Sequence, residues 1–280
     1  MGGPAQLRSR WNRIAKLLTI FSSLSFAAIT FAQEIVTLSA RPEIVQSYFL
    51  ASLPTSPQAI AVLFSGSGGF IRLRQEQEKI KFGNNNFLVR SRGEFIKRGI
   101  IAAIVDAPSD QQRGWGMADE FRMSEQHFTD LAAVVADLQR RFAKIPIFLV
   151  GTSRGTISAA ALAARFGPQI SGAILTATMF RQTGRKSREP GPGLSRFDFA
   201  TIKVPLLFVH HVNDQCSVTP YADAARLVDK YPLISVFGGR AAESEPCDPF
   251  SAHGFYGKES ETIEQIVNWM LKRPFLGEVK

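Results

Sequence analysis

The residues most suited to chemistry stand in the turn Gly151–Gly155, which has the pattern G-x-S-x-G with Ser153 at its centre. An apolar run precedes this turn and a helical pattern follows it, so the serine falls between a predicted strand and a predicted helix. At such a turn a serine is held in a strained backbone conformation with its hydroxyl exposed. The first amides of the helix can also stabilise an oxyanion that develops beside it. The pattern therefore predicts a nucleophile at Ser153, and the alternative is a tight turn without chemistry.

A serine hydroxyl is inert at neutral pH unless a base, itself oriented by an acid, takes its proton. The chain has four histidines. His127 lies in a helical pattern, where an exposed or capping role is expected, while His210 and His211 end an apolar run just before Asp214. His253 stands in a loop before the last helical pattern. An acid after the penultimate strand and a base after the last strand fit the chain order Ser, Asp, His. The alternatives are a loop-capping carboxylate at Asp214 and a surface histidine at His253.

These residues must be positioned by alternating strands and helices. Apolar or alternating runs predict eight strands, at Glu34–Ser39, Gln46–Ala51, Ala59–Phe64, Gly99–Val105, Ile145–Val150, Gly172–Thr176, Pro205–Val209 and Leu233–Phe237. Unbroken apolar strands are typical of parallel sheets that are buried on both faces. Helical periodicity lies between the strands, at Phe121–Phe142, Thr156–Phe166, Tyr221–Tyr231 and Ser260–Leu271. This alternation predicts a doubly wound α/β sheet in a single domain.

The sequence from about Ala59 to Leu271 resembles the α/β-hydrolase superfamily, in a secreted bacterial form without a large cap. The resemblance is carried by four features, which are the glycine loop Ser65–Gly69, the turn Gly151–Gly155, Asp214 and His253. It implies an eight-stranded, mostly parallel sheet whose first strands are antiparallel.

The same resemblance implies roles for individual residues. Ser153 would be the nucleophile, and the backbone N–H of Arg154 would donate to the oxyanion. A second N–H would come from Ser67, with Gly66 as the alternative. The superfamily often has His-Gly where this chain has Ser65-Gly66.

The first 32 residues are predicted to be a secretory signal peptide. Four basic residues precede an apolar stretch, Leu17–Ala32, that ends in small residues, and no acid occurs before Glu34. This order is typical of a signal for export to the periplasm or the medium. The alternative is a retained membrane anchor, although the stretch is short for a span that needs about 20 residues. The remaining domain is predicted to be residues 33–280.

The chain has two cysteines. Cys216 follows the predicted acid by two residues and Cys247 precedes the predicted base by six. If the acid and the base meet, both cysteines lie at the same end of the sheet. Export would place them in an oxidising compartment, which favours a disulfide that joins the two loops. The alternative is a pair of buried free thiols.

Two features are expected at the mouth of the site. Asp106 follows the predicted strand Gly99–Val105, so it is expected to border the cleft and either to contact substrate or to bind a loop. Trp115 stands between two glycines. It is predicted to form a mobile wall over an acyl group or, as the alternative, a surface turn.

Residues 179–199 form a long connection that is expected in place of a cap. Five basic residues and one acid lie within it, the basic ones being Arg181, Arg185, Lys186, Arg188 and Arg196. A basic loop beside the site could attract an anionic substrate, with Arg181 as a contact. The alternative is a solvated loop that does not touch substrate.

The net charge of +9 is concentrated in two places. Four positive charges belong to the predicted signal peptide, and most of the remainder belongs to the basic loop. No helical pattern carries a basic stripe with interleaved aromatics, so no nucleic-acid partner is expected. The histidines lack metal-ligand spacing and there is no acidic calcium loop, so neither a metal nor another cofactor is expected.

Together these patterns predict an exported serine hydrolase that cleaves small carboxylic esters through an acyl-enzyme. A peptidase, an amidase or an acyltransferase with the same three residues is the alternative. A non-catalytic periplasmic binding protein of the same fold is a further alternative, although it would have no chemical use for all three side chains. No membrane contact is expected once the signal peptide is removed.

Overall fold

The computed structural model describes residues 1–2, 32–52, 56–184 and 190–280. Its main feature is one nine-stranded sheet. The strands are β1 (Ala32–Arg41), β2 (Ile44–Ser52), β3 (Ala59–Phe64), β6 (Ile100–Val105), β7 (Ile147–Thr152), β8 (Gly172–Thr176), β9 (Leu206–His211), β10 (Leu233–Val236) and β11 (Glu278–Val279). A separate two-stranded hairpin consists of β4 (Arg74–Glu76) and β5 (Lys79–Lys81).

The strand order is β1-β2-β6-β3-β7-β8-β9-β10-β11. The pairs β1–β2 and β2–β6 are antiparallel, and every later pair is parallel. The predicted doubly wound, mostly parallel sheet with antiparallel first strands is therefore confirmed. The number of strands differs from the predicted eight, because β11 adds a ninth strand at the edge through two paired positions beside β10. A strand of two residues carries no periodicity that a sequence pattern can reveal.

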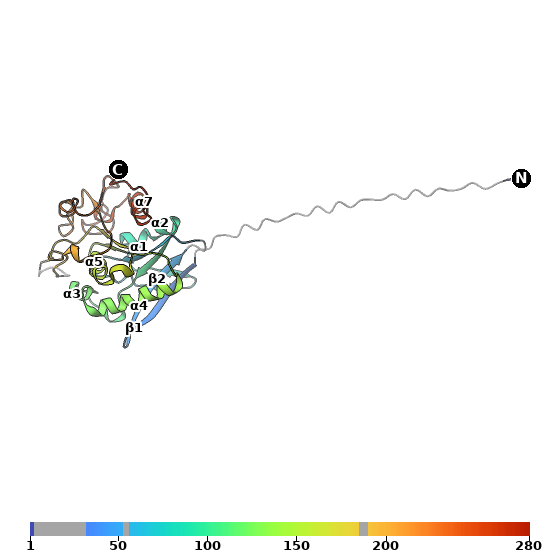
Figure 1. The fold of residues 1–280 in the computed structure, drawn as a ribbon, viewed down its shortest axis with the longest axis horizontal. Helices are drawn as coiled ribbons and strands as arrows, with labels where there is room; N and C mark the ends of the chain where they lie inside the picture. The colour runs from blue at the N-terminus through green and yellow to red at the C-terminus, as the bar shows by residue number, and fades with distance from the viewer. Residues whose placement is uncertain (3–31, 53–55, 185–189) are drawn as a thin grey trace.

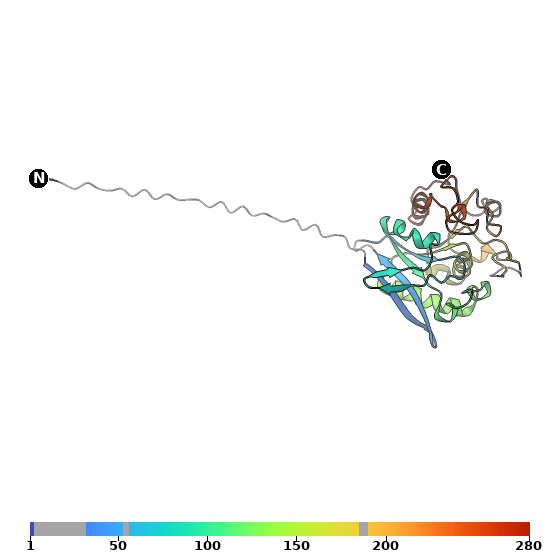
Figure 2. The same ribbon diagram turned by 180° about the vertical axis from the view of Figure 1, so that it is seen from behind.

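Helices cover both faces of the sheet (Figures 1 and 2). They are α1 (Phe87–Arg90), α2 (Arg92–Lys97), α3 (Asp119–Arg122), α4 (Glu125–Arg141), α5 (Gly155–Phe166), α6 (Tyr221–Ala225) and α7 (Glu259–Met270). Short 3₁₀ turns are η1 (Ser109–Gln111), η2 (Gly167–Gln169), η3 (Phe199–Thr201) and η4 (Ala252–Gly254). Side chains of α4 and α5 pack in one hydrophobic cluster, and those of α1, α2 and α7 pack in a second on the opposite face.

The central strand β3 shows why its apolar run is unbroken. All six of its residues are buried. Ile60, Val62 and Phe64 join the cluster with α4 and α5, while Ala59, Ala61 and Leu63 join the cluster with α1, α2 and α7. Because successive side chains of a strand point to opposite faces, a strand covered on both sides needs an apolar residue at every position.

The helix predicted over Phe121–Phe142 is two helices, α3 and α4. The break lies at Ser124, whose hydroxyl caps α4 by accepting a hydrogen bond from the backbone N–H of His127 at 3.2 Å. The helix predicted over Tyr221–Tyr231 ends early, at Ala225. The hydroxyl of Ser124 also donates to the carbonyl oxygen of Phe121 at 2.7 Å, and a short polar residue that bonds nearby backbone groups interrupts a helix without changing its apolar periodicity.

His127 corrects another expectation. Its side chain is neither exposed nor capping, because it is fully buried and packs against the rings of Phe64 and Phe121. Neither ring nitrogen has a hydrogen-bond partner among the described residues. Burial and the nearby guanidiniums of Arg122 and Arg41 lower the pKa of His127 to about 3.

The predicted signal peptide lies almost wholly outside the described residues, since β1 begins at Ala32. Within the described part of the chain, no helix has the length and apolar character needed to cross a membrane.

Candidate active site

Ser153 lies between the end of β7 and the start of α5, at the carboxyl edge of the sheet. Its backbone has a φ of +53°, in the left-handed region that non-glycine residues rarely adopt. A Cβ on Gly151 would lie 2.5 Å from the carbonyl oxygen of Gly155, and a Cβ on Gly155 would lie 2.2 Å from that of Phe64. Both glycines are therefore required by close backbone approach, and together they let the chain turn sharply under a half-buried serine.

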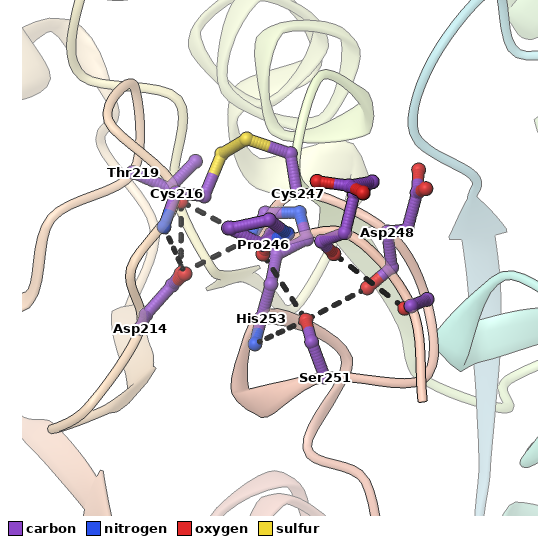
Figure 3. Close-up of a disulfide and its surroundings, with 10 residues drawn as sticks. Asp214, Cys216, Thr219, Pro246, Cys247, Asp248, Ser251 and His253 are labelled. Carbon is purple, nitrogen blue, oxygen red and sulfur yellow. Dashed lines mark hydrogen bonds and ion pairs between the residues drawn. A yellow bond between two sulfur atoms is a disulfide. The ribbon is translucent and has the colours of Figure 1, made fainter. Parts of the chain in front are cut away.

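Asp214 and His253 lie side by side (Figure 3), and His253 lines the same cavity as Ser153. Asp214 follows β9, and His253 lies in the 3₁₀ turn η4 after β10. The distance from Nδ1 of His253 to Oδ2 of Asp214 is 3.0 Å, and the two side chains are 5% and 0% exposed. A buried carboxylate in this contact fixes the orientation of the imidazole and holds the proton on Nδ1, which leaves Nε2 able to accept a proton.

Two further groups hold Asp214. The backbone N–H of Cys216 donates to Oδ1 at 2.9 Å, and the hydroxyl of Thr219 donates to Oδ2 at 2.8 Å. Hydrogen bonds of this kind stabilise an ionised carboxylate inside a protein. Thr219 was not predicted, since a threonine five residues beyond an acid belongs to no recognisable pattern.

Ser153 and His253 line one cavity of about 40 Å³. Its other lining residues come from the glycine loop, the start of α1 and the loop before His253, and they are Gly66, Ser67, Asn86, Phe87, Thr152, Cys247, Asp248, Pro249 and Gly254. A larger cavity, of about 620 Å³, is lined by residues such as Pro146, Ser171 and Pro205 that precede strands. It therefore lies at the opposite end of the sheet, and its described lining residues include no histidine and no carboxylate.

The predicted oxyanion loop lies directly against Ser153. A Cβ on Gly66 would lie only 3.0 Å from the Cβ of Ser153, so a larger residue there would push the loop away from Ser153. Ser67 has a φ of +47°, and its carbonyl oxygen accepts a hydrogen bond from Nη2 of Arg122 at 2.6 Å. Arg122 is buried and also donates to the hydroxyl of Ser158 on α5 at 3.0 Å. Its guanidinium therefore fixes the loop to α5, the helix that follows Ser153.

Arg154 presents its backbone at the start of α5, while its side chain has a structural contact. Nε of Arg154 donates to Oδ1 of buried Asp119 at 2.6 Å. Oδ2 of Asp119 accepts from the backbone N–H of Gly193 at 2.8 Å. The ion pair therefore ties the nucleophile turn to α3 and to the far end of loop 179–199. Sequence reasoning missed Arg122 and Asp119, because their partners lie far away in the chain.

Asp106 is not among the residues that line the cavity. The side chain is buried, and its carboxylate accepts the backbone N–H groups of Ile71, Leu73 and Ala107 at 2.7 to 2.9 Å. Burial raises the pKa of Asp106, and these N–H groups oppose that rise. The loop-binding alternative describes the residue correctly, since Asp106 holds the segment that follows the oxyanion loop.

The other two predicted substrate contacts do not line the cavity. Trp115 is 59% exposed, and its backbone lies against Gly68 of the oxyanion loop. Arg181 donates to both carboxylate oxygens of Asp223, at 2.8 and 3.3 Å. Three other basic residues of the loop, Arg185, Lys186 and Arg188, lie outside the described residues.

The predicted disulfide is confirmed. Cys216 and Cys247 are bonded, with 4.7 Å between their Cα atoms. The bond joins the loop after Asp214 to the loop before His253, directly beside the contact between these two side chains (Figure 3). It therefore constrains the relative position of Asp214 and His253.

The remaining histidines have other partners. Nε2 of His210 accepts the backbone N–H of Thr178 at 2.9 Å, and burial lowers the pKa of His210 to about 3. Both ring nitrogens of His211 contact backbone groups. Among the four histidines, only His253 lines the cavity with Ser153. The described part of the chain holds no cluster of three or more His, Cys, Asp or Glu side chains that could bind a metal.

Comparison with known sequences finds one family. Residues 94–236, about half of the chain, match the sequence model of the serine aminopeptidase S33 family. The matched span includes Ser153 and Asp214 and ends before His253. No curated protein sequence matches the chain.

Comparison with solved structures finds α/β serine hydrolases. A soluble variant of monoglyceride lipase from Saccharomyces cerevisiae is 12% identical, with a TM-score of 0.59 over 87% of this chain and 95% of that one. Est1E from Butyrivibrio proteoclasticus is 14% identical, with a TM-score of 0.55 over 85% and 98%. A serine hydrolase without a lid from Xanthomonas campestris is 13% identical, with a TM-score of 0.53 over 84% and 94%. At these identities the likeness establishes the fold, and the family match agrees with it.

Proposed function

Because the chain belongs to the serine aminopeptidase S33 family of α/β hydrolases, we propose that it is a serine hydrolase that cleaves small carboxylic esters through an acyl-enzyme. One observation carries this proposal. A hydroxyl on a strained turn shares a small cavity with an imidazole whose Nδ1 lies 3.0 Å from a buried carboxylate. This is the arrangement that acyl transfer by a serine nucleophile requires.

In the proposed reaction, Oγ of Ser153 attacks the carbonyl carbon of the ester while Nε2 of His253 takes the hydroxyl proton. Asp214 holds the imidazole and stabilises its charged form. The backbone N–H groups of Arg154 and Ser67, or of Gly66 in place of Ser67, stabilise the negative oxygen of the tetrahedral intermediate. His253 then gives its proton to the departing alcohol, and a water molecule, activated by the same imidazole, releases the acid and restores Ser153.

The small cavity supports esters with short acyl groups. The cavity that Ser153 and His253 line is small, at about 40 Å³. The described residues of loop 179–199 contain no α-helix that could form an apolar lid. An open and narrow site of this kind suits small esters better than triglycerides.

A panel of p-nitrophenyl esters from acetyl to palmitoyl, with matched anilides, tests the proposal. We expect the highest kcat/KM for the shortest acyl groups, and a loss of at least about a thousandfold in kcat in Ser153→Ala. The family description favours one alternative, a peptidase or amidase, which would cleave the anilides as fast as the esters. Transfer of the acyl group to added alcohols in preference to water would indicate an acyltransferase. Absence of any turnover would indicate a non-catalytic protein of this fold.

We also propose that the protein is exported and that residues 1–32 are removed. The disulfide supports this, because such bonds persist in oxidising compartments. Mass spectrometry of protein from periplasm and medium should find a chain that begins at Gln33. An intact chain in the membrane fraction would contradict export with cleavage.

An anionic substrate stays a prediction from the basic loop. The structure pairs Arg181 with Asp223, and neither of the loop's described basic residues, Arg181 and Arg196, is among the residues that line the cavity. Rates for esters with neutral, anionic and cationic acyl groups test whether the site prefers anions.

A further inference from the structure

The side-chain amide of Asn86 lies beside Ser153, and the proposed reaction does not use it. Asn86 lines the cavity that Ser153 and His253 share. A Cβ added to Gly66 would lie 3.0 Å from the Cβ of Ser153 and 3.3 Å from Nδ2 of Asn86. Both atoms therefore lie within 3.3 Å of one point on the glycine loop Ser65–Gly69, the loop from which the second oxyanion donor is expected.

Hydrogen bonds fix which atom of this carboxamide is the nitrogen and hold it in place. Oδ1 of Asn86 accepts the backbone N–H of Leu88 at 3.2 Å, and this contact makes Asn86 the N-cap of α1. Because a backbone N–H can only donate, the atom that it contacts must be the oxygen, and Nδ2 is the other atom of the group. The backbone N–H of Asn86 donates to Oδ1 of Asn84 at 3.1 Å, and its carbonyl oxygen accepts from the N–H of Arg90 at 2.9 Å. The amide nitrogen is thus positioned before any substrate binds.

This nitrogen has donors to spare. Asn86 is half-buried, and the two protons of Nδ2 have no acceptor among the residues that the structure describes. A positioned amide that donates to no protein group is able to donate to a molecule bound in the cavity. An amide nitrogen donates and does not accept, so the partner it suits is an oxygen, and most of all a negatively charged one.

We propose that Nδ2 of Asn86 donates a third hydrogen bond to the oxyanion, in addition to the two backbone N–H groups. This inference rests on the proposed acyl transfer at Ser153. When Oγ of Ser153 adds to the carbonyl carbon, the electron pair of the C=O bond moves to its oxygen and the hydroxyl proton moves to Nε2 of His253. The negative oxygen is bonded to the same carbon as Oγ, so it forms beside the glycine loop and Nδ2. A donor aimed at this position binds more strongly as charge develops, which lowers the barrier.

Asn86→Ser removes the donor and leaves the helix capped, because a serine hydroxyl accepts the same backbone N–H about as well as an asparagine does. We expect kcat for p-nitrophenyl acetate to fall about 100-fold with little change in KM, since the lost bond forms only in the transition state. Asn86→Asp also retains the cap but puts a negative oxygen in place of the nitrogen, so its kcat should fall further. Both variants should melt close to the wild-type temperature.

A trifluoromethyl ketone gives a readout that loss of a purely structural contact would not change. Ser153 adds to such a ketone and forms a stable hemiketal that carries a negative oxygen. Its inhibition constant should therefore rise in Asn86→Ser by about the factor by which kcat/KM falls. The matching trifluoromethyl alcohol cannot form the hemiketal, and it should bind the wild type and the variant equally.

Asn85→Ser is the matched control. It removes the same carboxamide one position earlier, from an exposed side chain that does not line the cavity. Its kcat should equal that of the wild type. The proposal is overturned by an unchanged kcat in Asn86→Ser, by an equal loss in the control, or by a loss that appears only in KM. Failure of the proposed function differs, because then the wild type cleaves no ester and does not react with a fluorophosphonate.

Discussion

At the scale of single residues, the place of the candidate oxyanion loop depends on one buried guanidinium. Arg122 contacts the carbonyl oxygen of Ser67 on one side and the hydroxyl of Ser158 on the other. An N–H group stabilises an oxyanion only if its direction is set before the reaction. Arg122 is therefore a positioning residue, which acts through the loop and does not touch the substrate.

Replacement of Arg122 by methionine tests this role. We expect kcat for a short ester to fall about 10- to 100-fold while KM changes little. The reason is that a displaced loop weakens the hydrogen bond from its N–H to the oxyanion, which forms only in the transition state. The melting temperature of the variant is measured alongside, and the assay is run well below it. Arg98→Met is the control, since Arg98 also donates to a backbone carbonyl, that of Ser260, at 3.2 Å but borders α2 and α7. A kcat equal to that of the wild type would contradict the positioning role.

Sequence alone could propose the residues that share one pattern, and it missed those whose contacts lie far away in the chain. Ser153, Asp214 and His253 follow a known chain order at the ends of predicted strands, so their meeting could be predicted. Arg122 and Ser67 are 55 positions apart, and no local pattern links them. The sequence places Asp106 after a strand but does not assign it a role. That role depends on backbone N–H groups that point toward its carboxylate only in the folded loop.

At the scale of elements, the disulfide joins two loops that follow neighbouring strands, β9 and β10. The bonded residues are separated by 31 positions. Closure of a loop of this length reduces the entropy of the unfolded chain and stabilises the fold by about 3.5 kcal/mol. The bond also lies beside the contact between Asp214 and His253, so its loss should affect stability and activity together.

We expect excess reductant to lower the melting temperature by about 7–14 °C and to reduce esterase activity in parallel. Differential scanning fluorimetry with and without reductant, combined with a thiol count, measures this. The double variant Cys216→Ser, Cys247→Ser is the control, and its melting temperature should not respond to reductant. An unchanged melting temperature of the wild type after two thiols have appeared would contradict the role of the bond.

The elements themselves were predictable to the extent that burial dictates their sequence. Strands β3, β6 and β7 have buried residues at every position, and their apolar runs predicted each end to within two residues. The short helices α1 and α2 and the strand β11 were not predicted. They have two to six residues each, too few to show a period, and tertiary contacts hold them.

At the scale of the whole molecule, two buried histidines make stability depend on pH. Burial lowers the pKa of His127 and of His210 to about 3, from an ordinary value of 6.5. The folded chain keeps both rings neutral, whereas the unfolded chain protonates them below pH 6.5. Their contribution to stability is thus complete above pH 6.5 and is lost as the pH falls toward about 3.

His127→Phe tests this dependence in apolar surroundings that suit a phenyl ring. Each buried histidine should cost about 1.4 kcal/mol of unfolding free energy per pH unit between pH 6 and pH 4. The variant should therefore lose about 1.4 kcal/mol less per pH unit than the wild type. Urea unfolding at several pH values measures both slopes, and equal slopes would contradict the assignment of a neutral, buried His127.

The central claim is that the fold assembles Ser153, His253 and Asp214 into a reactive serine. Reaction with a fluorophosphonate tests it most directly, because only an activated hydroxyl displaces the fluoride and forms a stable phosphonyl ester. Intact mass spectrometry should show one adduct on the wild type, located on Ser153 by peptide mapping. The adduct should be absent from Ser153→Ala and should form far more slowly in Asp214→Asn, in which the imidazole loses its orienting carboxylate. A wild-type protein without any adduct, or an adduct that persists in Ser153→Ala, would contradict the account.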